Sequence, residues 1–421
     1  MVASVAEGRA VPPDLSNVQA LMELLDHPER SAPVIHVTGT NGKTSTARVI
    51  GSLLAAKGLR VGTFTSPHLE LINERISADG RPISDADLLE VLSSLASYCT
   101  MLDSRPRWFE LITAAAFMWF ADRPVDVVVL EVGMGGRWDA TNVADASVAV
   151  ITNVGLDHIE FLGPTREDIA REKVGIVKPE SILILGESDP ELRAVFEEPP
   201  SAGVWLDGRD FGISRNELAV GGRSLDLRTP GADYEGVWLD LHGSHQGRNF
   251  ACALAAVEAF FGAAVDDKLV REAAATVSSP GRMEIVWKEP LVVLDGAKNL
   301  EGAEAASQAV AEEFGSTRSV VLVVGMLGGA AKDPTAMLSA LGVGTPAVRL
   351  VVTCPAPSPR SVPEALIADA ARRLGCGAIE TPGVAEALEA ALADSGENDL
   401  ILVTGSLYVV GAARSALAAL S

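Results

Sequence analysis

The chain has 421 residues, which is too long for one typical domain and predicts two. Hydrophobic residues make up 48% and charged residues 21%, as in a soluble globular protein. The formal net charge of −22 argues against nucleic acid as a partner. Any phosphate or carboxylate ligand must therefore be held by a few local Lys and Arg residues.

The N-terminus lacks the basic start and apolar core of a signal peptide, and no apolar run reaches membrane-spanning length. The four cysteines, Cys99, Cys252, Cys354 and Cys376, are scattered without metal-ligand spacing. Free thiols in a reducing compartment are the simplest interpretation. We therefore expect a cytoplasmic protein without a membrane segment.

The first half of the chain alternates between strand and helix signals. An apolar run at 33–38 predicts a buried strand, residues 43–57 have helical spacing that Gly58 can end, and 59–67 returns as a strand. A helix is predicted at 110–121, and further apolar strands at 125–133 and 146–154. This order is typical of a parallel sheet.

The later segments predict a change of architecture. Residues 187–242 are polar and rich in Gly and Pro, which indicates a β-rich excursion, and a helix resumes at 244–260. Residues 278–285 contain Pro280 and Gly281 and form the best candidate linker. We therefore predict one domain over 1–282 and a smaller α/β domain over 283–421. Its strands are expected at 290–297, 318–326, 347–355 and 399–406.

The stretch HVTGTNGKTS at 36–45 indicates a phosphate-binding loop of unusual length. Gly42, Lys43 and Thr44 fit the usual pattern, but that pattern needs a glycine at position 37, which is Val37. The nearest upstream glycine is Gly39. Backbone N–H groups and a helix N-terminus can still point at an anion here, because the loop lies between a strand and a helix. We interpret it as a shorter variant of the loop.

Three polar residues at strand ends are candidate partners of this loop. Glu131 ends the very apolar strand VVVLE, where a carboxylate is costly unless it is paired or metal-bound. Ser66 follows the second strand, and His158 follows another. Mg²⁺ needs oxygen ligands beyond the phosphates. The three residues converge on the loop only if the order of strands in the sheet brings them close.

Taken together, these stretches resemble the folylpolyglutamate synthase/dihydrofolate synthase family, a branch of the Mur-ligase-like ATP-dependent amide-bond-forming enzymes. The resemblance implies a P-loop-type parallel-sheet ATPase domain followed by a smaller Rossmann-like α/β domain. The matching stretches are HVTGTNGKTS, TFTSPHL, RWFELITAAAF, VLEVGMGGRWDATN, ITNVGLDHIEFLG, IAREKVGIVK, HQGRNFACA, PGRMEI, LDGAKN and VTGSLY. They run from about residue 20 to 410.

The resemblance implies roles for individual residues. Those expected at the nucleotide are Gly39, Thr40, Asn41, Gly42, Lys43, Thr44, Asn249, Arg282 and Asp295. The implied metal ligands are Thr44, Ser66, Glu131, His158 and Lys173, the last carbamylated so that it helps hold a second Mg²⁺. The implied catalytic residues are Lys43, Lys173, Asp295 and Lys298. Ser406 lies in a C-terminal motif near the interdomain cleft expected for the family.

The implied reaction joins L-glutamate to dihydropteroate, to reduced folates, or to both. ATP phosphorylates a carboxylate, and the amine of glutamate attacks the acyl phosphate. A monomer suffices, since the family reaction needs one chain. Two alternatives stay open: a Mur-like ligase for another carboxylate, and a nucleotide-binding protein that has lost ligase activity.

The sequence departs from the family pattern in the C-terminal half. The family carries Asp-Gly-Ala-His-Asn where this chain has LDGAKN, so Lys298 replaces a histidine and Leu300 replaces the proline that follows. A permanent cation is kept, and a titrating group is lost. Residues 326–334 have gained Gly and Ala before Lys332 and Asp333. We expect that loop to be remodelled.

Overall fold

The structure is a computed structural model that describes residues 14–314, 319–329 and 333–420. Lys332, in the loop expected to be remodelled, lies outside these residues. The chain divides into two compact units. The first unit comprises residues 1–217, 224–240 and 246–277, and the second comprises 218–223, 241–245 and 278–421. The second unit therefore includes two short segments that precede its main part in the sequence.

An eight-stranded sheet forms the centre of the first unit, in the order β4-β3-β2-β5-β1-β6-β7-β8. Its strands are β1 (Val34–Thr38), β2 (Val61–Phe64), β3 (Ile76–Ala78), β4 (Arg81–Pro82), β5 (Val127–Glu131), β6 (Ala146–Ile151), β7 (Ile182–Leu185) and β8 (Gly203–Leu206). The neighbouring strands β2, β5, β1, β6, β7 and β8 are all parallel, while β3 and β4 add an antiparallel edge beside β2. This order places β5 and β6 on either side of β1, with β2 beside β5.

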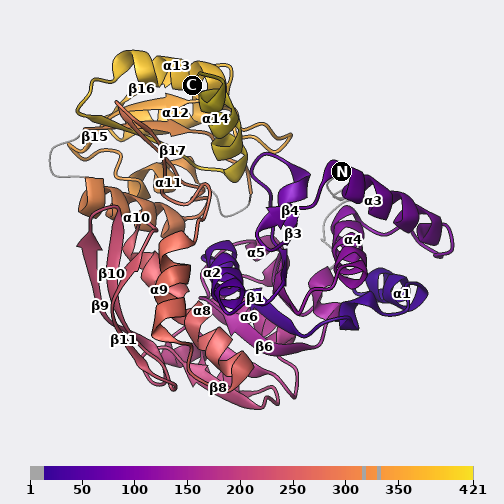
Figure 1. Cartoon of the computed structure of the whole chain (residues 1–421). Coiled ribbons are helices and arrows are strands. Elements are labelled where there is room, and N and C mark those ends of the chain that lie inside the picture. The colour runs from indigo at the N-terminus through magenta and orange to yellow at the C-terminus, as the bar shows by residue number, and fades with distance from the viewer. Residues whose placement is uncertain (1–13, 315–318, 330–332, 421) are drawn as a thin grey trace. The chain divides into compact units, whose positions relative to one another are not determined.

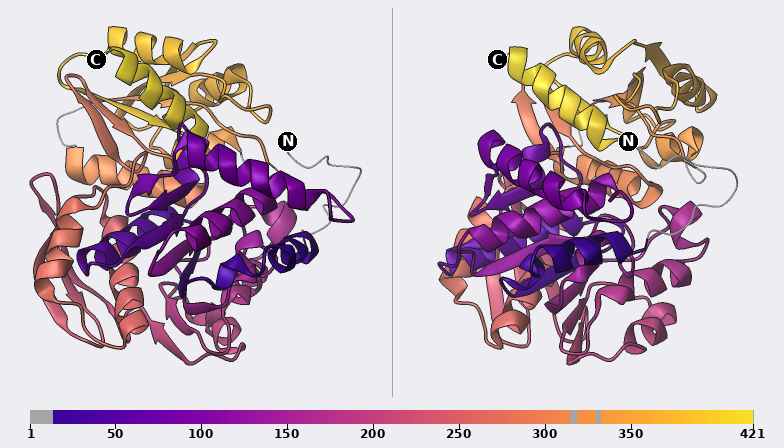
Figure 2. Two further views of the ribbon diagram at one scale, coloured as in Figure 1. Left: turned by 45° about the vertical axis from the view of Figure 1, so that its right-hand side comes forward. Right: turned by 90° about the vertical axis from the view of Figure 1, so that its right-hand side faces the viewer.

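Helices cover this sheet because its strands are apolar on both faces, as all-buried parallel strands require. The helices are α1 (Ser16–Leu24), α2 (Lys43–Ala56), α3 (Asp85–Cys99), α4 (Trp108–Asp122), α5 (Ile159–Leu162), α6 (Arg166–Lys173), α7 (Arg193–Glu197), α8 (Ser244–Phe261) and α9 (Asp267–Thr276). Figures 1 and 2 show α3 and α4 side by side, and these helices share a hydrophobic cluster with α1. Gly58 has a φ of 85° directly after α2, as its predicted end requires.

The segment expected to be a β-rich excursion contains two kinds of strand. β8 extends the main sheet in parallel with β7. The remaining strands, β9 (Gly212–Ala219), β10 (Gly222–Arg228) and β11 (Asp233–Leu239), form a separate three-stranded sheet.

The second unit has a six-stranded sheet in the order β12-β13-β17-β14-β15-β16. Its strands are β12 (Glu284–Lys288), β13 (Leu291–Leu294), β14 (Ser319–Val324), β15 (Val348–Thr353), β16 (Gly377–Glu380) and β17 (Asp399–Thr404). Its helices are α10 (Leu300–Ala309), α11 (Pro334–Ala340), α12 (Glu364–Arg373), α13 (Val384–Asp394) and α14 (Leu407–Leu420). All strand pairs are parallel except β12 with β13. Because β12 begins at Glu284, the last two residues of the predicted linker, Glu284 and Ile285, belong to a strand.

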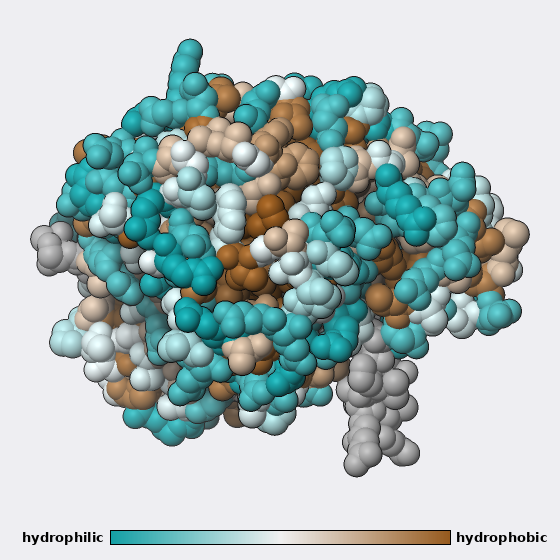
Figure 3. All heavy atoms as spheres, turned by 90° about the horizontal axis from the view of Figure 1, so that it is seen from below, coloured by the Kyte–Doolittle hydropathy of each residue, from teal (hydrophilic) through white to brown (hydrophobic). Residues whose placement is uncertain are grey.

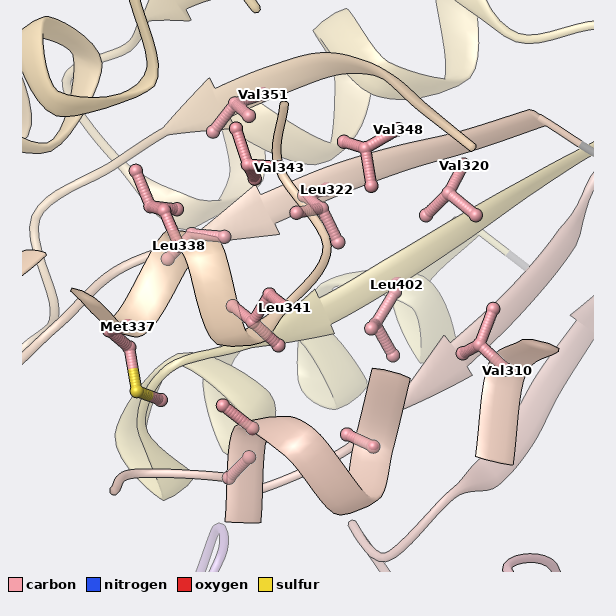
Figure 4. Packing of buried hydrophobic residues seen from close by; sticks show 14 of the residues in the cluster. Val310, Val320, Leu322, Met337, Leu338, Leu341, Val343, Val348, Val351 and Leu402 are labelled. Carbon is pink, nitrogen blue, oxygen red and sulfur yellow. The ribbon is translucent and has the colours of Figure 1, made fainter. Parts of the chain in front are cut away.

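The core of the second unit lies between this sheet and the helices α10 to α12. Figure 4 shows Leu322 of β14 and Leu402 of β17 beside Leu338 and Leu341 from the α11 region. These side chains are between 0% and 3% exposed. The apolar runs that predicted the four central strands thus form the buried layer of an α/β unit.

The described residues contain no helix long and apolar enough to cross a membrane. Figure 3 shows hydrophilic residues over most of one face, with smaller groups of hydrophobic residues between them. Scattered surface hydrophobics of this kind are ordinary in folded proteins.

Candidate active site

The predicted phosphate loop connects β1 to α2 at the carboxyl edge of the first sheet. β1 ends at Thr38, and α2 begins at Lys43. The first turn of α2 therefore directs its backbone N–H groups and the positive end of its dipole at the loop. An anion such as a triphosphate can be bound at such a helix end.

Two loop glycines are required by their surroundings. Gly39 has a φ of 153°, and a Cβ there would lie 1.8 Å from the hydroxyl oxygen of Thr152. Gly42 has a φ of 80°, and a Cβ there would lie 2.3 Å from Oδ1 of Asn249. Both positions combine a backbone conformation that favours glycine with a close neighbour. The short loop therefore has its own glycine requirements, which explains why Val37 can replace the glycine of the longer pattern.

Lys43 lies over the loop that precedes it. Its Nζ donates to the carbonyl oxygen of Gly39 at 2.9 Å and to that of Thr40 at 3.3 Å. The side chain is half-buried. The ammonium group is thus held beside the loop, where it can neutralise phosphate charge.

A second segment, Thr152–Gly155, braces the phosphate loop. Asn153 Oδ1 accepts from the backbone N–H of Asn41 at 2.9 Å and from that of Thr40 at 3.2 Å. The Thr152 hydroxyl donates to the Asn41 carbonyl at 2.6 Å. Thr40 Oγ1 accepts from the backbone N–H of Gly155 at 2.9 Å and lies 3.1 Å from the carbonyl oxygen of Gly155.

The prediction from sequence missed this brace. Its only signal was a polar Thr152–Asn153 pair at the end of an apolar strand. The two segments are more than 110 positions apart in the chain, and only the pairing of β6 with β1 brings them together.

Glu131 joins the loop to the end of β2. Its carboxylate is 1% exposed. Oε1 accepts from the Thr44 hydroxyl at 2.8 Å, and Oε2 accepts from the backbone N–H of Ser66 at 2.9 Å. The sheet order therefore brings two of the three strand-end residues, Glu131 and Ser66, together beside Thr44 of the loop. The two donors offset part of the cost of burying a charge in so apolar a strand.

The donor set around Glu131 fits a magnesium ion held partly by its substrate. One carboxylate and one hydroxyl supply hard oxygen ligands, and Mg²⁺ is usually bound by one or two carboxylates together with substrate phosphates. No group of three or more His, Cys, Asp or Glu side chains within the described residues could hold a metal by itself.

His158 and Lys173 lie on the segments that follow β6. His158 has a φ of 54°, and it begins α5 with Nε2 at 3.7 Å from Oδ2 of Asp157. A non-glycine residue in this conformation is uncommon and is often found at functional sites. Lys173 ends α6 and is 2% exposed. Lysine is rarely this buried unless its charge is paired.

The backbone next to Lys173 packs against the loop that follows Glu131. A Cβ on Gly136 would lie 2.7 Å from the carbonyl oxygen of Glu172 and 2.9 Å from that of Lys173. The backbone N–H of Arg137 donates to the Glu172 carbonyl at 2.9 Å. The end of α6 is thus fixed to the loop after β5.

Asn249 is the predicted nucleotide residue on α8. It is 8% exposed, and its Nδ2 donates to Oε1 of Gln246 at 3.0 Å. Its Oδ1 lies against Gly42. The structure therefore brings Asn249 beside the phosphate loop within the first unit.

The loop that follows β5 contains a buried chain of hydrogen-bonded polar side chains that ends in the core. The Thr141 hydroxyl lies 2.6 Å from Oδ1 of Asp139 and 2.8 Å from Nε2 of His36. Burial lowers the pKa of His36 to about 3, with a smaller contribution from Lys178, so the ring is neutral. Asp139 also accepts from Met134 N at 3.0 Å, which ties the loop after Glu131 to β1.

In the second unit, Asp295 follows β13 and is 6% exposed. Its oxygens accept from the backbone N–H groups of Met283 at 3.0 Å and Ala297 at 2.9 Å. Burial raises the pKa of Asp295, and Arg282 and His245 oppose this shift. Arg282 is close, because a Cβ on Gly296 would lie 2.7 Å from its Nη1. Asp295 and Arg282 therefore meet within one unit.

Lys298 and Ser406 lie at the same edge of the second sheet. Lys298 is half-buried and lines a small pocket with Asn299, Met326 and Asp333. Ser406 is 2% exposed, and its Oγ accepts from the backbone N–H of Tyr408 at 3.2 Å as α14 begins. Leu300 is the first residue of α10 and is exposed.

Comparison with known proteins identifies two domains that match these units. The profile of the Mur ligase middle domain matches residues 37–257, and that of the Mur ligase glutamate ligase domain matches 281–407. The dihydrofolate synthase/folylpolyglutamate synthase of Mycobacterium tuberculosis is 40% identical over 444 residues, covering 96% of this chain and 90% of that protein.

Solved structures agree with the sequence match. The Mycobacterium tuberculosis folylpolyglutamate synthase complexed with ADP and AMPPCP has a TM-score of 0.90 at 40% identity, covering 96% of this chain and 95% of that one. A bifunctional folylpolyglutamate synthase/dihydrofolate synthase with Mn, AMPPNP and L-glutamate bound has a TM-score of 0.85 at 30% identity, covering 98% and 96%. This chain belongs to the dihydrofolate synthase/folylpolyglutamate synthase family of Mur-type ligases.

Proposed function

We propose that the protein is an ATP-dependent ligase that joins L-glutamate to dihydropteroate, to the glutamyl tail of reduced folates, or to both. The observation that carries this proposal is the contact of Glu131 with Thr44 and Ser66 at the mouth of a phosphate loop. This contact supports the proposal, because a buried carboxylate beside a phosphate loop can serve a metal ion that is bound with a triphosphate. The names of the relatives, which include both synthase activities, support the substrate classes.

The chemistry balances as a phosphoryl transfer followed by an acyl transfer. A carboxylate oxygen of the pteroate or folate attacks the γ-phosphorus of ATP, the bond to the β-phosphate oxygen breaks, and ADP leaves. The amine nitrogen of glutamate then attacks the acyl carbon, and phosphate leaves with the carboxylate oxygen. The amine loses one proton when the amide forms. No covalent bond to the protein is needed, so a nucleophilic Ser or Cys is not required.

Residues of the first unit bind and orient the nucleotide in this proposal. The N–H groups at the start of α2 and the Lys43 ammonium hold the phosphates. Thr44 and Glu131 hold a magnesium ion, with Ser66 and His158 as further ligands. When bound, the ion supplies positive charge beside the transferred phosphoryl group. Asn249 orients the nucleoside next to Gly42.

Lys173 is proposed to be carbamylated, so that the amine becomes a carboxylate able to hold a second magnesium ion. Its burial at the end of α6 supports this, because a buried charge is favourable only when it is paired, and a carbamate could pair with a metal ion. Depletion of dissolved CO₂ should lower activity, and added bicarbonate should restore it. A Lys173→Ala variant that loses activity without any response to bicarbonate would complete the test.

Residues of the second unit handle the amino acid and the nucleotide phosphates. We propose that Arg282 binds phosphate oxygens, that Asp295 handles nucleotide and amino acid, and that Lys298 supplies a fixed cation. The proposed domains are 1–282 and 283–421. We further propose a cytoplasmic monomer, which the four free cysteines support.

Release of ADP by purified protein tests the function. Mg-ATP is supplied with L-glutamate alone, with dihydropteroate added, and separately with tetrahydrofolate added. Joint dependence on glutamate and one of these acceptors is expected, and the acceptor that works distinguishes a dihydrofolate synthase, a polyglutamate synthase and the bifunctional enzyme. ATP binding without release under any condition would overturn the proposal and favour a lost activity or another carboxylate.

A further inference from the structure

An ion pair holds both backbone polar groups of one residue, Val154, in the brace of the phosphate loop. Arg166, the first residue of α6, donates from Nε to the carbonyl oxygen of Val154 at 2.9 Å. Glu187, which follows β7, accepts the backbone N–H of Val154 on Oε2 at 2.9 Å. The same Oε2 lies 3.0 Å from Nη2 of Arg166. Arg166 and Glu187 therefore clamp Val154 between them.

The clamped residue lies between two of the residues that contact the phosphate loop. Asn153 holds the backbone N–H groups of Thr40 and Asn41, and Gly155 is paired with the Thr40 hydroxyl. Displacement of Val154 would move both contacts at once, because the three residues are consecutive. The clamp thus acts on the geometry of the phosphate loop through the backbone of one residue.

The clamp is also connected to the other predicted metal ligands. Arg166 begins the helix that ends at Lys173, and the clamped segment leads into His158 four positions after Val154. Asp189 pairs with Nη1 of Arg166 and fixes the guanidinium from a second side. Although burial opposes it, the carboxylates of Glu187 and Asp189 raise the pKa of Arg166, so the cation is permanent.

The carboxylate side distinguishes this ion pair from the pairs that Arg171 makes on the same helix. The side chain of Glu187 is 10% exposed, whereas those of Glu167 and Glu198 are 59% and 65% exposed. The two arginines are similarly exposed, at 39% for Arg166 and 46% for Arg171. Exposed pairs contribute little, whereas a nearly buried carboxylate that also accepts a backbone N–H can position its neighbours.

We propose that Arg166 and Glu187 are positioning residues that hold the Asn153–Gly155 segment against the phosphate loop and so set the loop for nucleotide and metal. This inference rests on the proposed function for its consequence in turnover. Its structural part, the ordering of the loop, can be measured on the ligand-free protein.

Hydrogen exchange followed by mass spectrometry tests the structural part. In Arg166→Met and Glu187→Gln, peptides covering 36–45 and 152–158 should exchange about tenfold faster than in the unaltered protein. Peptides of β7 and of the second unit should be unchanged. Arg171→Met, which removes an exposed arginine from the same helix, is the matched control and should leave both loop peptides unchanged.

Steady-state kinetics test the consequence. The KM for ATP and the Mg²⁺ concentration for half-maximal activity should rise by about tenfold to 100-fold in both variants, with the KM for the pteroate or folate unchanged. Arg166→Lys, which keeps the charge and loses the planar fork, should give an intermediate shift. The double variant should be no worse than the poorer single variant, because the two residues act as one unit.

Unchanged exchange in the two loop peptides would overturn the inference, as would an equal rise across the whole first unit, which would indicate general destabilisation. An equal rise in the KM values of all substrates would overturn it as well. If the unaltered protein showed no glutamate-dependent ADP release, the proposed function would fail, while the exchange result would still decide whether the clamp orders the loop.

Discussion

The two sheets present their buried carboxylates in different ways. Glu131, in the first unit, accepts from the hydroxyl of a loop residue and from a backbone N–H of a neighbouring strand end. Asp295, in the second unit, accepts from two backbone N–H groups, that of Met283 just before the neighbouring strand β12 and that of Ala297 two residues further along its own segment. Burial raises the pKa of Asp295 even though Arg282 and His245 oppose the shift.

This difference shows that position at a sheet edge does not by itself define a role. Glu131 is part of a network that joins the ends of β5 and β2 to the first turn of α2, and it is arranged before any ligand arrives. Burial destabilises the ionised form of Asp295. A hydrogen-bond donor or a cation on a ligand would therefore stabilise the ionised carboxylate. The carboxyl edge of the sheet in the first unit is called the first edge, and that of the sheet in the second unit the second edge. We therefore expect changes at the first edge to alter the response of activity to metal and phosphate, and changes at the second edge to alter its response to the remaining substrates.

Among the variants of the two edges, Lys43→Ala should lower activity the most. Removal of the ammonium beside the loop should lower kcat by about 10³-fold, since a charged group on the transferred phosphoryl is lost. The free energy of unfolding should change by less than about 1 kcal/mol, because the side chain is half-buried. Turnover and urea denaturation measure the two quantities.

Lys57→Ala is the matched control for this variant. Lys57 lies at the other end of the same helix, where its Nζ is 4.4 Å from the centre of the Phe261 ring. It should keep its turnover. Activity of Lys43→Ala close to that of the unaltered protein would show that the loop assignment is wrong.

Glu131→Gln should give the next largest effect. The amide keeps an acceptor for Ser66 N, but the charge is lost, so kcat/KM should fall by about 10²-fold and the Mg²⁺ requirement should rise. Activity measured over a range of Mg²⁺ concentrations reports both changes. Asp295→Asn makes the same change at the other edge, and it should lower activity without shifting the Mg²⁺ requirement. Equal shifts in the two variants would remove the distinction between the edges.

His36 makes the stability of the first unit depend on pH. Its pKa falls from 6.5 to about 3 on folding, so the unfolded chain binds a proton between these values and the folded chain does not. The contribution of His36 to stability is therefore present above pH 6.5 and is lost as pH falls towards 3. Between pH 7 and pH 5 the loss should be about 2 kcal/mol.

His36→Gln removes the titrating group and keeps a side chain that can donate to Thr141. The free energy of unfolding from urea denaturation at pH 7 and at pH 5 should therefore change less in the variant than in the unaltered protein. Identical changes would mean that His36 does not carry this dependence.

Lys298→His should give the smallest effect. It restores the residue expected from the family pattern and keeps a polar side chain in the same pocket, so kcat/KM should be preserved or should rise by no more than about threefold. Steady-state kinetics at pH 7 measure it. A collapse of activity would show that the second edge has been rebuilt around the lysine.

Local patterns predicted the parts of the site that are close in sequence. The loop from Gly39 to Thr44, the helix that starts at Lys43 and the end of that helix at Gly58 all follow from spacing and backbone preference. Glu131 was identified because a charge is costly in so apolar a strand. Thr44 and Ser66 contact it, while their role as metal ligands stays a prediction.

Contacts between distant segments could not be predicted in this way. Asn153 braces a loop more than 110 positions earlier, and nothing in its own neighbourhood indicates which strand β6 will join. The same limit applies to the clamp on Val154 and to β8, which extends the main sheet where a separate β-rich segment was expected. Glu284 and Ile285 were assigned to a linker because the local sequence pattern does not indicate that β12 pairs with β13 in antiparallel.

Isotope transfer tests most directly whether the first edge activates a carboxylate by phosphorylation. Dihydropteroate or tetrahydrofolate with an ¹⁸O-labelled terminal carboxylate is incubated with protein, Mg-ATP and L-glutamate, and the released phosphate is analysed by mass spectrometry. We predict one ¹⁸O atom in each phosphate, formed in equal amounts with ADP and the new amide. Unlabelled phosphate formed together with ADP would mean that water takes the phosphoryl group, and would contradict the account.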